Sequence, residues 1–199
     1  MRGLEQIPLL YDALMAVGDW TGLGEWRRWL TSGARGPTLE VGCGTGRNLP
    51  RYPATLPVVA LDPAFDSLLR ARRRAPHIPL VQASAEALPF REGVFETVVS
   101  GLVFCSVPDP LKGLAEVRRV LHSSGQLRML EHVRHTDGTL SGRWQDFIQP
   151  AWTRVTGGCH NNRHTEGNVE QAGFAIDGEG RRANGTMRRF SARKASAPT

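Results

Sequence analysis

Hydrophobic residues between positions 37 and 131 fall into five short runs that alternate with stretches of helical spacing. The runs are nearly continuous, which is typical of strands covered on both faces. The predicted strands are Pro37–Val41, Pro57–Leu61, Ile78–Ala83, Val94–Ser100 and Gln126–Glu131, and the predicted helices are Gly46–Tyr52, Ala64–Ala75 and Pro110–Leu121. Because strands that alternate with helices form parallel βαβ units, the pattern predicts an α/β fold with a doubly wound, Rossmann-like, mostly parallel sheet and helices on both faces.

The pattern changes at the two ends of the chain. Apolar residues in Leu9–Leu30 have helical spacing that glycines interrupt, which predicts two short helices. After the fifth strand, Trp144–Val155 is predicted to be helical, with Pro150 kinking or splitting it. A further helix is predicted over Arg163–Ala172, ended by Gly173.

Two more strands are predicted near the C-terminus, Phe174–Ile176 and Met187–Ala192. The segment Asp177–Thr186 between them is rich in Gly and Arg, which favours a long hairpin connection. The sheet is therefore expected to have seven strands and to end in an antiparallel hairpin. Residues 195–199 are expected to be a frayed tail.

The length and the charge distribution of the chain limit the number of domains and the kinds of partner it is expected to have. The 199 residues fit one domain, and the formal net charge is +6. Every Asp and Glu lies at or before Glu179, and the cations beyond it are Arg181, Arg182, Arg188, Arg189, Arg193 and Lys194. The part before them is formally neutral, whereas a nucleic-acid binder usually carries a basic stripe across its folded face. We expect no specific nucleic-acid partner; a membrane-surface or polyanion role for the basic end stays open.

Cysteine usage and hydropathy indicate a cellular location. Cys43, Cys105 and Cys159 are odd in number and far apart, which is typical of a reducing compartment. The longest weakly polar run, Val98–Val107, is 10 residues, and a membrane helix needs about 20. We therefore expect a cytoplasmic protein with no transmembrane segment, for which peripheral membrane contact is possible.

The strongest local motif is a glycine loop. The strand Thr38–Val41 leads directly into Gly42, Gly44 and Gly46. Alternating glycines let the backbone turn sharply and let a ligand approach it, at the strand end where open α/β sheets bind ligands. In the dinucleotide fingerprint the third glycine comes one residue later, at the position that Arg47 occupies here.

Two carboxylates accompany this loop. Glu40 directly precedes it and would place an anion near a diphosphate, which is unfavourable, whereas an ammonium or sulfonium group suits that position. Asp62 ends the second strand, 20 residues after Gly42. A carboxylate there can accept hydrogen bonds from both hydroxyls of a ribose, although dinucleotide folds use the same feature.

Four blocks of the chain together resemble a known family. They are Glu40–Gly46, Leu61–Asp62, Ala85–Phe90 and Arg119–Leu127. In order and spacing they resemble the class I S-adenosylmethionine-dependent methyltransferases, and in particular the small-molecule group that includes ubiquinone and menaquinone C-methyltransferases. The resemblance covers about Tyr11 to Val133. The stretch Trp144–Gly173 is similar, more loosely, to thiol-directed methyltransferases of the same fold.

The resemblance implies a single methyltransferase domain with S-adenosylmethionine as cofactor. Its parts would be an N-terminal helical cap (1–33), a cofactor-binding core (34–134), acceptor-side helices (135–173) and the terminal hairpin (174–194). The implied cofactor-binding residues are Glu40 and Gly42 beside the methionine part, Gly44 and Gly46 in the same loop, Asp62 at the ribose, and Ser84, Ala85, Leu102 and Val103 around the adenine. Ser84 stands where the family usually carries an Asp, so its hydrogen bond to the adenine amino group would lack charge assistance.

Methyl transfer from a sulfonium is an in-line displacement, which needs a base only if the acceptor must lose a proton. The candidate bases are Glu131, His132, His135, Asp146, His160 and His164. His132 is favoured because it follows the fifth strand and faces the crevice. His160 is expected to line the pocket of a small, lipophilic methyl acceptor.

Three alternatives to this interpretation arise from the same residues. Cys159, His160 and His164 could share a metal ion, but no further ligand is nearby in the sequence, so no metal site is predicted. An NAD-type oxidoreductase remains an alternative function, as does a non-catalytic nucleotide-binding module.

Overall fold

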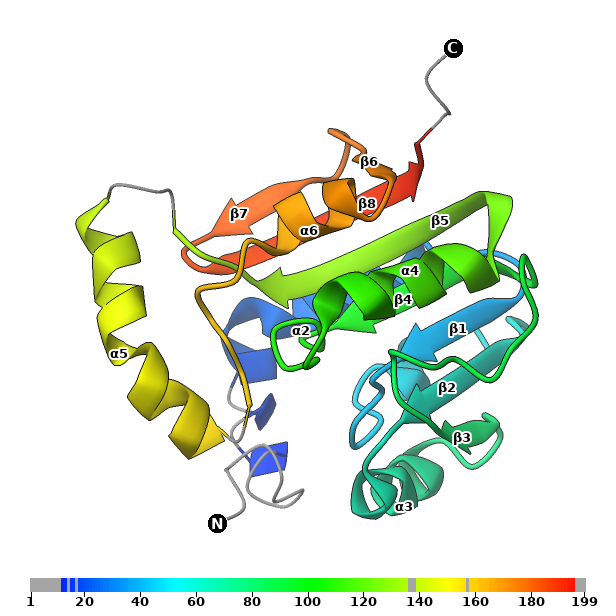
Figure 1. Cartoon of the computed structure of the whole chain (residues 1–199). Coiled ribbons are helices and arrows are strands. Elements are labelled where there is room, and N and C mark those ends of the chain that lie inside the picture. Colours follow the sequence, from blue (N-terminus) through cyan, green and yellow to red (C-terminus); the bar gives the residue numbers. More distant parts are fainter. Residues whose placement is uncertain (1–11, 14, 17, 136–138, 157, 196–199) are drawn as a thin grey trace.

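The strands form one mixed sheet around a parallel centre. The computed structural model describes residues 12, 13, 15, 16, 18–135, 139–156 and 158–195. Its strands are β1 (Thr38–Val41), β2 (Val58–Asp62), β3 (Leu80–Gln82), β4 (Phe95–Gly101), β5 (Leu121–His132), β6 (Phe174–Ile176), β7 (Arg182–Asn184) and β8 (Met187–Lys194). Their order is β3-β2-β1-β4-β5-β8-β6, with β7 also paired to β8 (Figure 1). The first five strands are parallel, and β8 runs antiparallel to β5.

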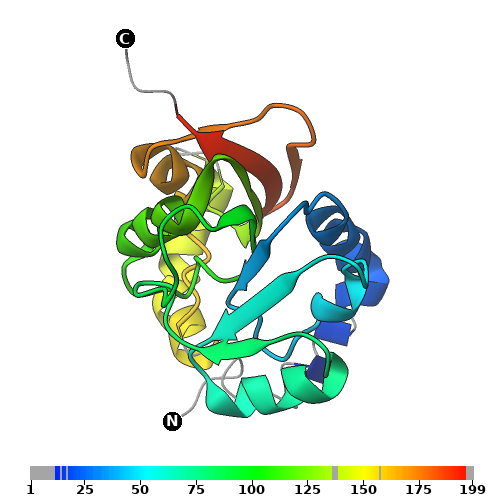
Figure 2. The ribbon, with the colours of Figure 1, turned by 90° about the vertical axis from the view of Figure 1, so that its right-hand side faces the viewer.

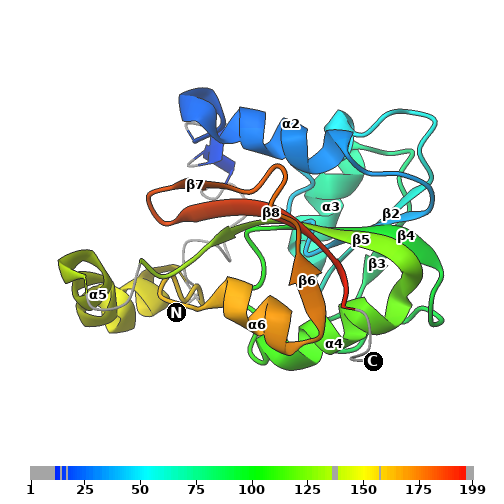
Figure 3. The ribbon, with the colours of Figure 1, turned by 90° about the horizontal axis from the view of Figure 1, so that it is seen from above.

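Helices cover both faces of this sheet. On one face lie α2 (Gly24–Ser32) and α3 (Phe65–Arg74), and on the other lie α4 (Pro110–Val120) and α6 (Thr165–Gln171) (Figures 2 and 3). The long helix α5 (Leu140–Thr156) extends beside the sheet rather than over it (Figure 1). The strand residues Leu39, Val41, Ala60 and Val99 are fully buried, as the continuous apolar runs predicted. The predicted doubly wound α/β fold is confirmed.

The sheet has one strand more than expected within the described part of the chain. The segment predicted as a long hairpin connection contains β7, which pairs with β8 across a turn at Gly185 (φ 56°). Because Arg182–Asn184 is exposed along its whole length, it has no apolar alternation from which a strand could be recognised. The antiparallel ending was correct, and the count of seven strands was too low by one.

Two helix predictions need correction. The helix expected over Gly46–Tyr52 is a single 3₁₀ turn, η3 (Leu49–Arg51), which tolerates Pro50 in its first turn. It ends at Tyr52, which is extended (φ −72°, ψ 143°), because Pro53 disfavours the helical conformation of the residue before it. Conversely, α5 is not split at Pro150 but runs through it.

Part of the predicted N-terminal pair of helices lies outside the described residues, including Leu10, Leu14 and Val17. The described part contains a short π-helical turn, η2 (Asp19–Leu23), which leads directly into α2. Gly22 in that turn has φ 119°, so the irregularity expected in this glycine-rich segment is present. Two carboxylates, Asp12 and Asp19, tie this end to the glycine loop through ion pairs with Arg47.

None of the helices formed by the described residues combines the length and the apolar character needed to cross a membrane.

The third glycine of the loop is required by packing. Gly46 has φ +80°, and a Cβ there would lie 2.8 Å from the Ala71 Cα of α3. We expect Gly46→Ala to lower the free energy of unfolding by about 2–3 kcal/mol, since overpacking adds to the strain of a positive φ. Gly44→Ala is the matched control: it has φ +54° but, among the described residues, no heavy atom within 4 Å of the added Cβ. Urea unfolding of both variants measures the difference, and equal losses would contradict the packing role.

Candidate active site

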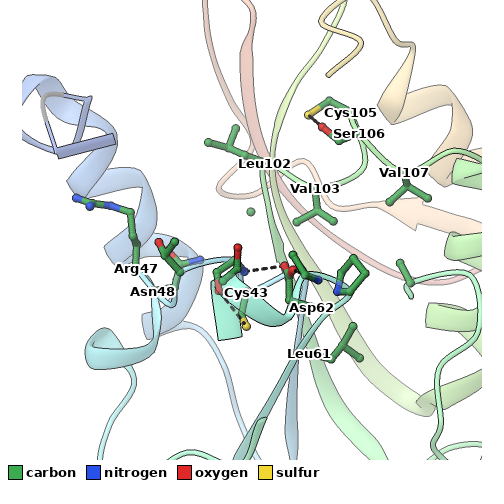
Figure 4. A pocket seen from close by; sticks show the side chains of 18 of the residues that line it. Cys43, Arg47, Asn48, Leu61, Asp62, Leu102, Val103, Cys105, Ser106 and Val107 are labelled. Atoms are coloured by element: carbon green, nitrogen blue, oxygen red, sulfur yellow. Dashed lines mark hydrogen bonds between the residues drawn. The ribbon is translucent and has the colours of Figure 1, made fainter. Parts of the chain in front are cut away.

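A cavity of about 670 Å³ opens at the carboxyl ends of the central strands. These ends lie where the chain order reverses between β1 and β4, the position at which open α/β sheets bind ligands. The predicted site residues that line it are Gly42, Gly44, Asp62, Ser84, Ala85, Leu102, Val103 and His132. Figure 4 shows Cys43 and Asp62 on one side of the cavity and Leu102, Val103 and Cys105 on the other. The topology thus brings together residues from five separate segments.

The glycine loop forms one wall of this cavity by close backbone approach. Gly42 has φ +67°, and a Cβ on it would lie 2.5 Å from the side chain of Val103. Gly44 faces open space in the cavity. Gly46 lies behind the loop against Ala71, so the structure gives this predicted cofactor residue a packing role.

Asp62 closes the turn between the loop and the second strand. It is 8% exposed, and its two carboxylate oxygens accept hydrogen bonds from the backbone N–H groups of Gly44 (2.8 Å) and Ala64 (2.9 Å). Burial raises the pKa of Asp62, and these two hydrogen bonds oppose that shift. Each carboxylate oxygen keeps a further lone pair, so the group can still accept hydrogen bonds from a ligand in the cavity.

Glu40 lies one layer behind the cavity wall. It is 1% exposed and accepts a hydrogen bond from Asn48 Nδ2 (2.9 Å), while Asn48 in turn accepts one from Arg27 (2.8 Å). Asn48 and Arg27 both line the cavity. Glu40 is therefore not itself a lining residue, and Asn48 connects it to the cavity; its place beside the methionine part of a cofactor stays a prediction. Residue types and spacing do not reveal these two residues: Asn48 lies just after the loop but belongs to no motif, and Arg27 reaches the site from α2.

Comparison with known proteins identifies the family. The model of the methyltransferase domain family matches residues 39–129. Demethylmenaquinone methyltransferase from Renibacterium salmoninarum is 32% identical over 170 residues, which are 79% of this chain and 72% of that protein. The chain belongs to the class I S-adenosylmethionine-dependent methyltransferases.

Two further similarities concern the sequence and the fold. Thiol S-methyltransferase TMT1B from Homo sapiens is 38% identical over 144 residues, 69% of this chain, and the chain spans 59% of the length of that relative. A solved S-adenosylmethionine-dependent methyltransferase from Thermotoga maritima, described as a possible histamine N-methyltransferase, shares the fold with a TM-score of 0.72. It is 18% identical, and the match covers 96% of this chain and 97% of that one. The family predicted from the four sequence blocks is confirmed, and an NAD-type oxidoreductase is not favoured.

Ser84 and Leu102 line the end of the cavity predicted for the adenine. Ser84 Oγ accepts a hydrogen bond from the Glu86 N–H and donates one to the Glu86 carboxylate, both 3.2 Å. Leu102 has φ 63°, rare for a non-glycine residue, and its N–H donates to Leu130 O (2.7 Å). A strained conformation of this kind persists only where the surrounding structure holds it, and such residues cluster at functional sites.

Glu131, one of the candidate general bases, holds neighbouring backbone in place through its carboxylate. It is fully buried and accepts hydrogen bonds from Ser100 Oγ (3.0 Å) and from the N–H groups of Val103 (3.1 Å) and Phe104 (3.2 Å). Burial raises the pKa of Glu131 to about 7, against the effect of these hydrogen bonds. The carboxylate thus fixes the loop after β4, which forms the cavity wall opposite the glycine loop.

Of the histidines proposed as bases, His132 lines the cavity. His135 borders a separate hollow beside α5. Asp146 forms an ion pair with Arg134, and His160 Nδ1 lies 2.8 Å from Gly158 O. His164 is exposed at the start of α6. The predicted acceptor-pocket role of His160 stays a prediction.

The structure also assembles a cluster that the sequence analysis missed. Cys105, His132 and Cys159 each offer a donor atom, and these atoms all lie within 4.8 Å of one another. Hydrogen bonds from Cys105 and His132 lower the pKa of the Cys159 thiol, whereas the pKa of Cys105 is raised. Cys105 follows β4 and Cys159 follows α5, so no local spacing in the sequence could have indicated that they meet.

Burial raises the pKa of Glu40 to about 7, and this shift can be tested through the pH dependence of stability. In the unfolded chain a Glu titrates near 4.5, so this group favours folding most below that pH, and its contribution is lost as the pH rises towards 7. Between pH 5 and pH 8, we expect the free energy of unfolding of the wild type to fall by about 2–3 kcal/mol more than that of Glu40→Gln.

Urea unfolding of the cofactor-free protein at several pH values measures this difference. The exposed Glu92→Gln serves as the control variant. Parallel pH profiles of Glu40→Gln and the wild type would contradict the assignment.

Proposed function

We propose that the protein transfers the methyl group of S-adenosylmethionine to a small thiol. The observation that carries the reaction class is the single cavity that runs from the glycine loop and Asp62 to Cys105, Val107 and His132. Its volume of about 670 Å³ lies within the range of pockets that hold a drug-sized ligand. The thiol class is supported by the similarity to TMT1B, a thiol S-methyltransferase.

The polar groups of the cavity support a position for the cofactor. We place the ribose at Asp62, the methionine part along Gly42 and Gly44, and the adenine between Ser84 and Leu102. The buried carboxylate of Glu40 favours the positive charge of the cofactor, and Asn48 separates the two. Ala85, also at the cavity wall, packs beside the adenine.

We propose the opposite end for the acceptor, where His132 lines the cavity. The acceptor sulfur attacks the methyl carbon in line with the sulfonium, and most of the rate acceleration comes from holding the two atoms about 3–3.5 Å apart. The protonated thiol is a weak nucleophile, so it must lose its proton before attack, and His132 is the candidate to accept it.

Cys159 of the 135–173 segment lies beside this end of the cavity, since its sulfur is within 4.8 Å of a ring nitrogen of His132, which lines it. This supports the acceptor-side role given to the segment. Its helix α5 exposes Leu140 (83%), Trp144 (62%) and Phe147 (76%). Contact of this apolar surface with a membrane stays a prediction, as does a cytoplasmic location.

A nucleic-acid acceptor is not favoured by the basic end of the chain. Arg189 lies over the Trp29 ring (4.9 Å), Arg181 pairs with Glu166 (2.9 Å), and Arg193 lies 3.6 Å from Asp177. Several of the excess cations are therefore engaged within the molecule rather than arranged as a free basic stripe.

The proposal is tested by following S-adenosylhomocysteine release by mass spectrometry with panels of thiols, quinols and amines. We expect turnover with thiols and formation of the matching methyl thioether. In parallel, S-adenosylmethionine and S-adenosylhomocysteine should raise the melting temperature and NADH should not, since a ligand of the folded state stabilises it. A folded protein that binds the cofactor but methylates only quinols or amines would overturn the thiol assignment.

Ser84 allows the adenine position to be tested. Ser84→Asp would supply a charge-assisted hydrogen bond to the adenine amino group, but the Glu86 carboxylate lies 3.2 Å from Ser84 Oγ and would repel the new charge. We therefore expect Ser84→Asp to tighten S-adenosylhomocysteine binding up to about tenfold in a Glu86→Gln background, and less when Glu86 is present. Calorimetric titration of both variants and of Glu86→Gln alone measures this. Weaker binding by the folded double variant than by Glu86→Gln would place the adenine elsewhere.

A further inference from the structure

Three side chains that can bind a metal ion, from separate segments, meet at the proposed acceptor end of the cavity. Cys105 follows β4, His132 ends β5, and Cys159 lies between α5 and α6. Their donor atoms, two sulfurs and one ring nitrogen, all lie within 4.8 Å of one another. Cys105 and Cys159 are buried and free of disulfides, and Cys105 and His132 line the cavity.

The backbone at each donor is held in place. The carbonyl oxygen of Cys105 accepts a hydrogen bond from the His160 N–H (2.7 Å), and the Cys159 N–H donates to Thr156 Oγ1 (3.2 Å). His132 is fixed by the pairing of β5 with β8. The donors therefore sit on a supported frame, as a preorganised ligand set requires.

Donor type and spacing indicate which ion fits. Around a tetrahedral Zn²⁺, with Zn–S of about 2.3 Å and Zn–N of about 2.0 Å, donor atoms lie about 3.5–3.8 Å apart. Side-chain adjustments of about 1 Å bring the present donors to that spacing. Two thiolates and one imidazole form a set found in catalytic zinc sites, which keep a fourth position open. The ion and the two thiolates together carry no formal charge, so the nearby guanidinium of Arg163 does not oppose it.

We propose that Cys105, His132 and Cys159 bind one zinc ion whose fourth position faces the cavity and takes the sulfur of the acceptor. The thiol class of this acceptor rests on the proposed function, whereas the metal site rests on the cluster alone. His132 is then a ligand, and the ion replaces it as the group that makes the acceptor nucleophilic.

The reaction balances without a further reagent. The acceptor thiol loses its proton to solvent as its sulfur binds the ion, because metal coordination favours the thiolate. That sulfur forms a bond to the methyl carbon while the bond from this carbon to the cofactor sulfonium breaks, and the electron pair of the broken bond stays on the cofactor sulfur. The products are a methyl thioether, S-adenosylhomocysteine and one proton, and the neutral thioether leaves the ion.

Metal content tests the site independently of methyl transfer. The full chain is purified without chelators, and zinc is measured by elemental mass spectrometry. We expect about one zinc per wild-type chain, and a small fraction of that in Cys105→Ser and Cys159→Ser. Cys43→Ser is the matched control because Cys43 is also buried and free but lies in the glycine loop, so its zinc content should equal that of the wild type.

A second measurement needs only the wild type, so it remains informative if the cysteine variants fail to fold. Wild-type protein is stripped with a chelator and titrated with Co²⁺, and we expect a thiolate-to-cobalt charge-transfer band that saturates at about one equivalent. A wild type that binds no Zn²⁺ or Co²⁺ would overturn the site. Equal zinc contents of Cys43→Ser and folded Cys105→Ser would also overturn it. The same holds if a thiol count of the untreated protein shows that Cys105 and Cys159 form a disulfide.

Activity then separates the metal site from the proposed function. We expect the zinc-free protein to keep its S-adenosylhomocysteine affinity within about twofold and to lose thiol methylation at least about tenfold, with recovery on adding Zn²⁺. Full thiol methylation by zinc-free protein would overturn the inference and leave the proposed function intact. One bound zinc without methylation of any thiol would support the site and count against the proposed function.

Discussion

Asp62→Ala is expected to weaken S-adenosylhomocysteine binding by about 100-fold or more. Hydrogen bonds to a charged group contribute about 1.5–3 kcal/mol each, and the proposed ribose position has two of them. The carboxylate also holds the glycine loop through the Gly44 N–H (2.8 Å), so its removal loosens a second wall of the cavity. Isothermal titration calorimetry measures the loss.

The matched variant is Asp62→Asn, which has nearly the same shape but keeps one acceptor oxygen and no charge. We expect its affinity to lie between those of Asp62→Ala and the wild type. Circular dichroism and the melting temperature show whether each variant is folded. A folded Asp62→Ala that binds as tightly as the wild type would refute the ribose assignment.

The second large effect is expected on stability, at Glu131. Glu131→Ala leaves without an acceptor the donors that now converge on the carboxylate, from Ser100, Val103 and Phe104. Each buried donor without an acceptor costs about 1–3 kcal/mol, so we expect the free energy of unfolding to fall by about 4 kcal/mol. Urea unfolding at neutral pH measures it.

Glu131→Gln separates the hydrogen bonds from the mere presence of a side chain. It fills the same space and keeps one acceptor oxygen, but its amide N–H₂ faces groups that are themselves donors. Its loss should be smaller than that of Glu131→Ala and still measurable. A loss below about 1 kcal/mol for Glu131→Ala would show that the loop after β4 is held by other contacts.

The sheet and the end of the cavity at the glycine loop and Asp62 were predictable because their signals are local. A buried strand produces a continuous apolar run, and a sharp turn at its end requires glycine at positions such as Gly42, whatever the rest of the chain does. Asp62 was recognisable from its place at the end of β2, since parallel strands bring their carboxyl ends to one edge. These features can be recognised in the sequence because each depends mainly on residues that are its neighbours in the chain.

Other features depend on which segments meet, and only the tertiary structure decided them. Gly46 is needed because α3 packs against the loop, and β7 forms because β8 offers it an edge. Glu131 looked like a candidate base, but its buried surroundings are donors from β4 and the loop that follows. Cys105 and Cys159 come together at His132 through the crossover to β5 and the return of the chain after α5. Apolar periodicity determines that such elements form, whereas their contacts depend on strand order and on side-chain packing between distant segments, which no local pattern encodes.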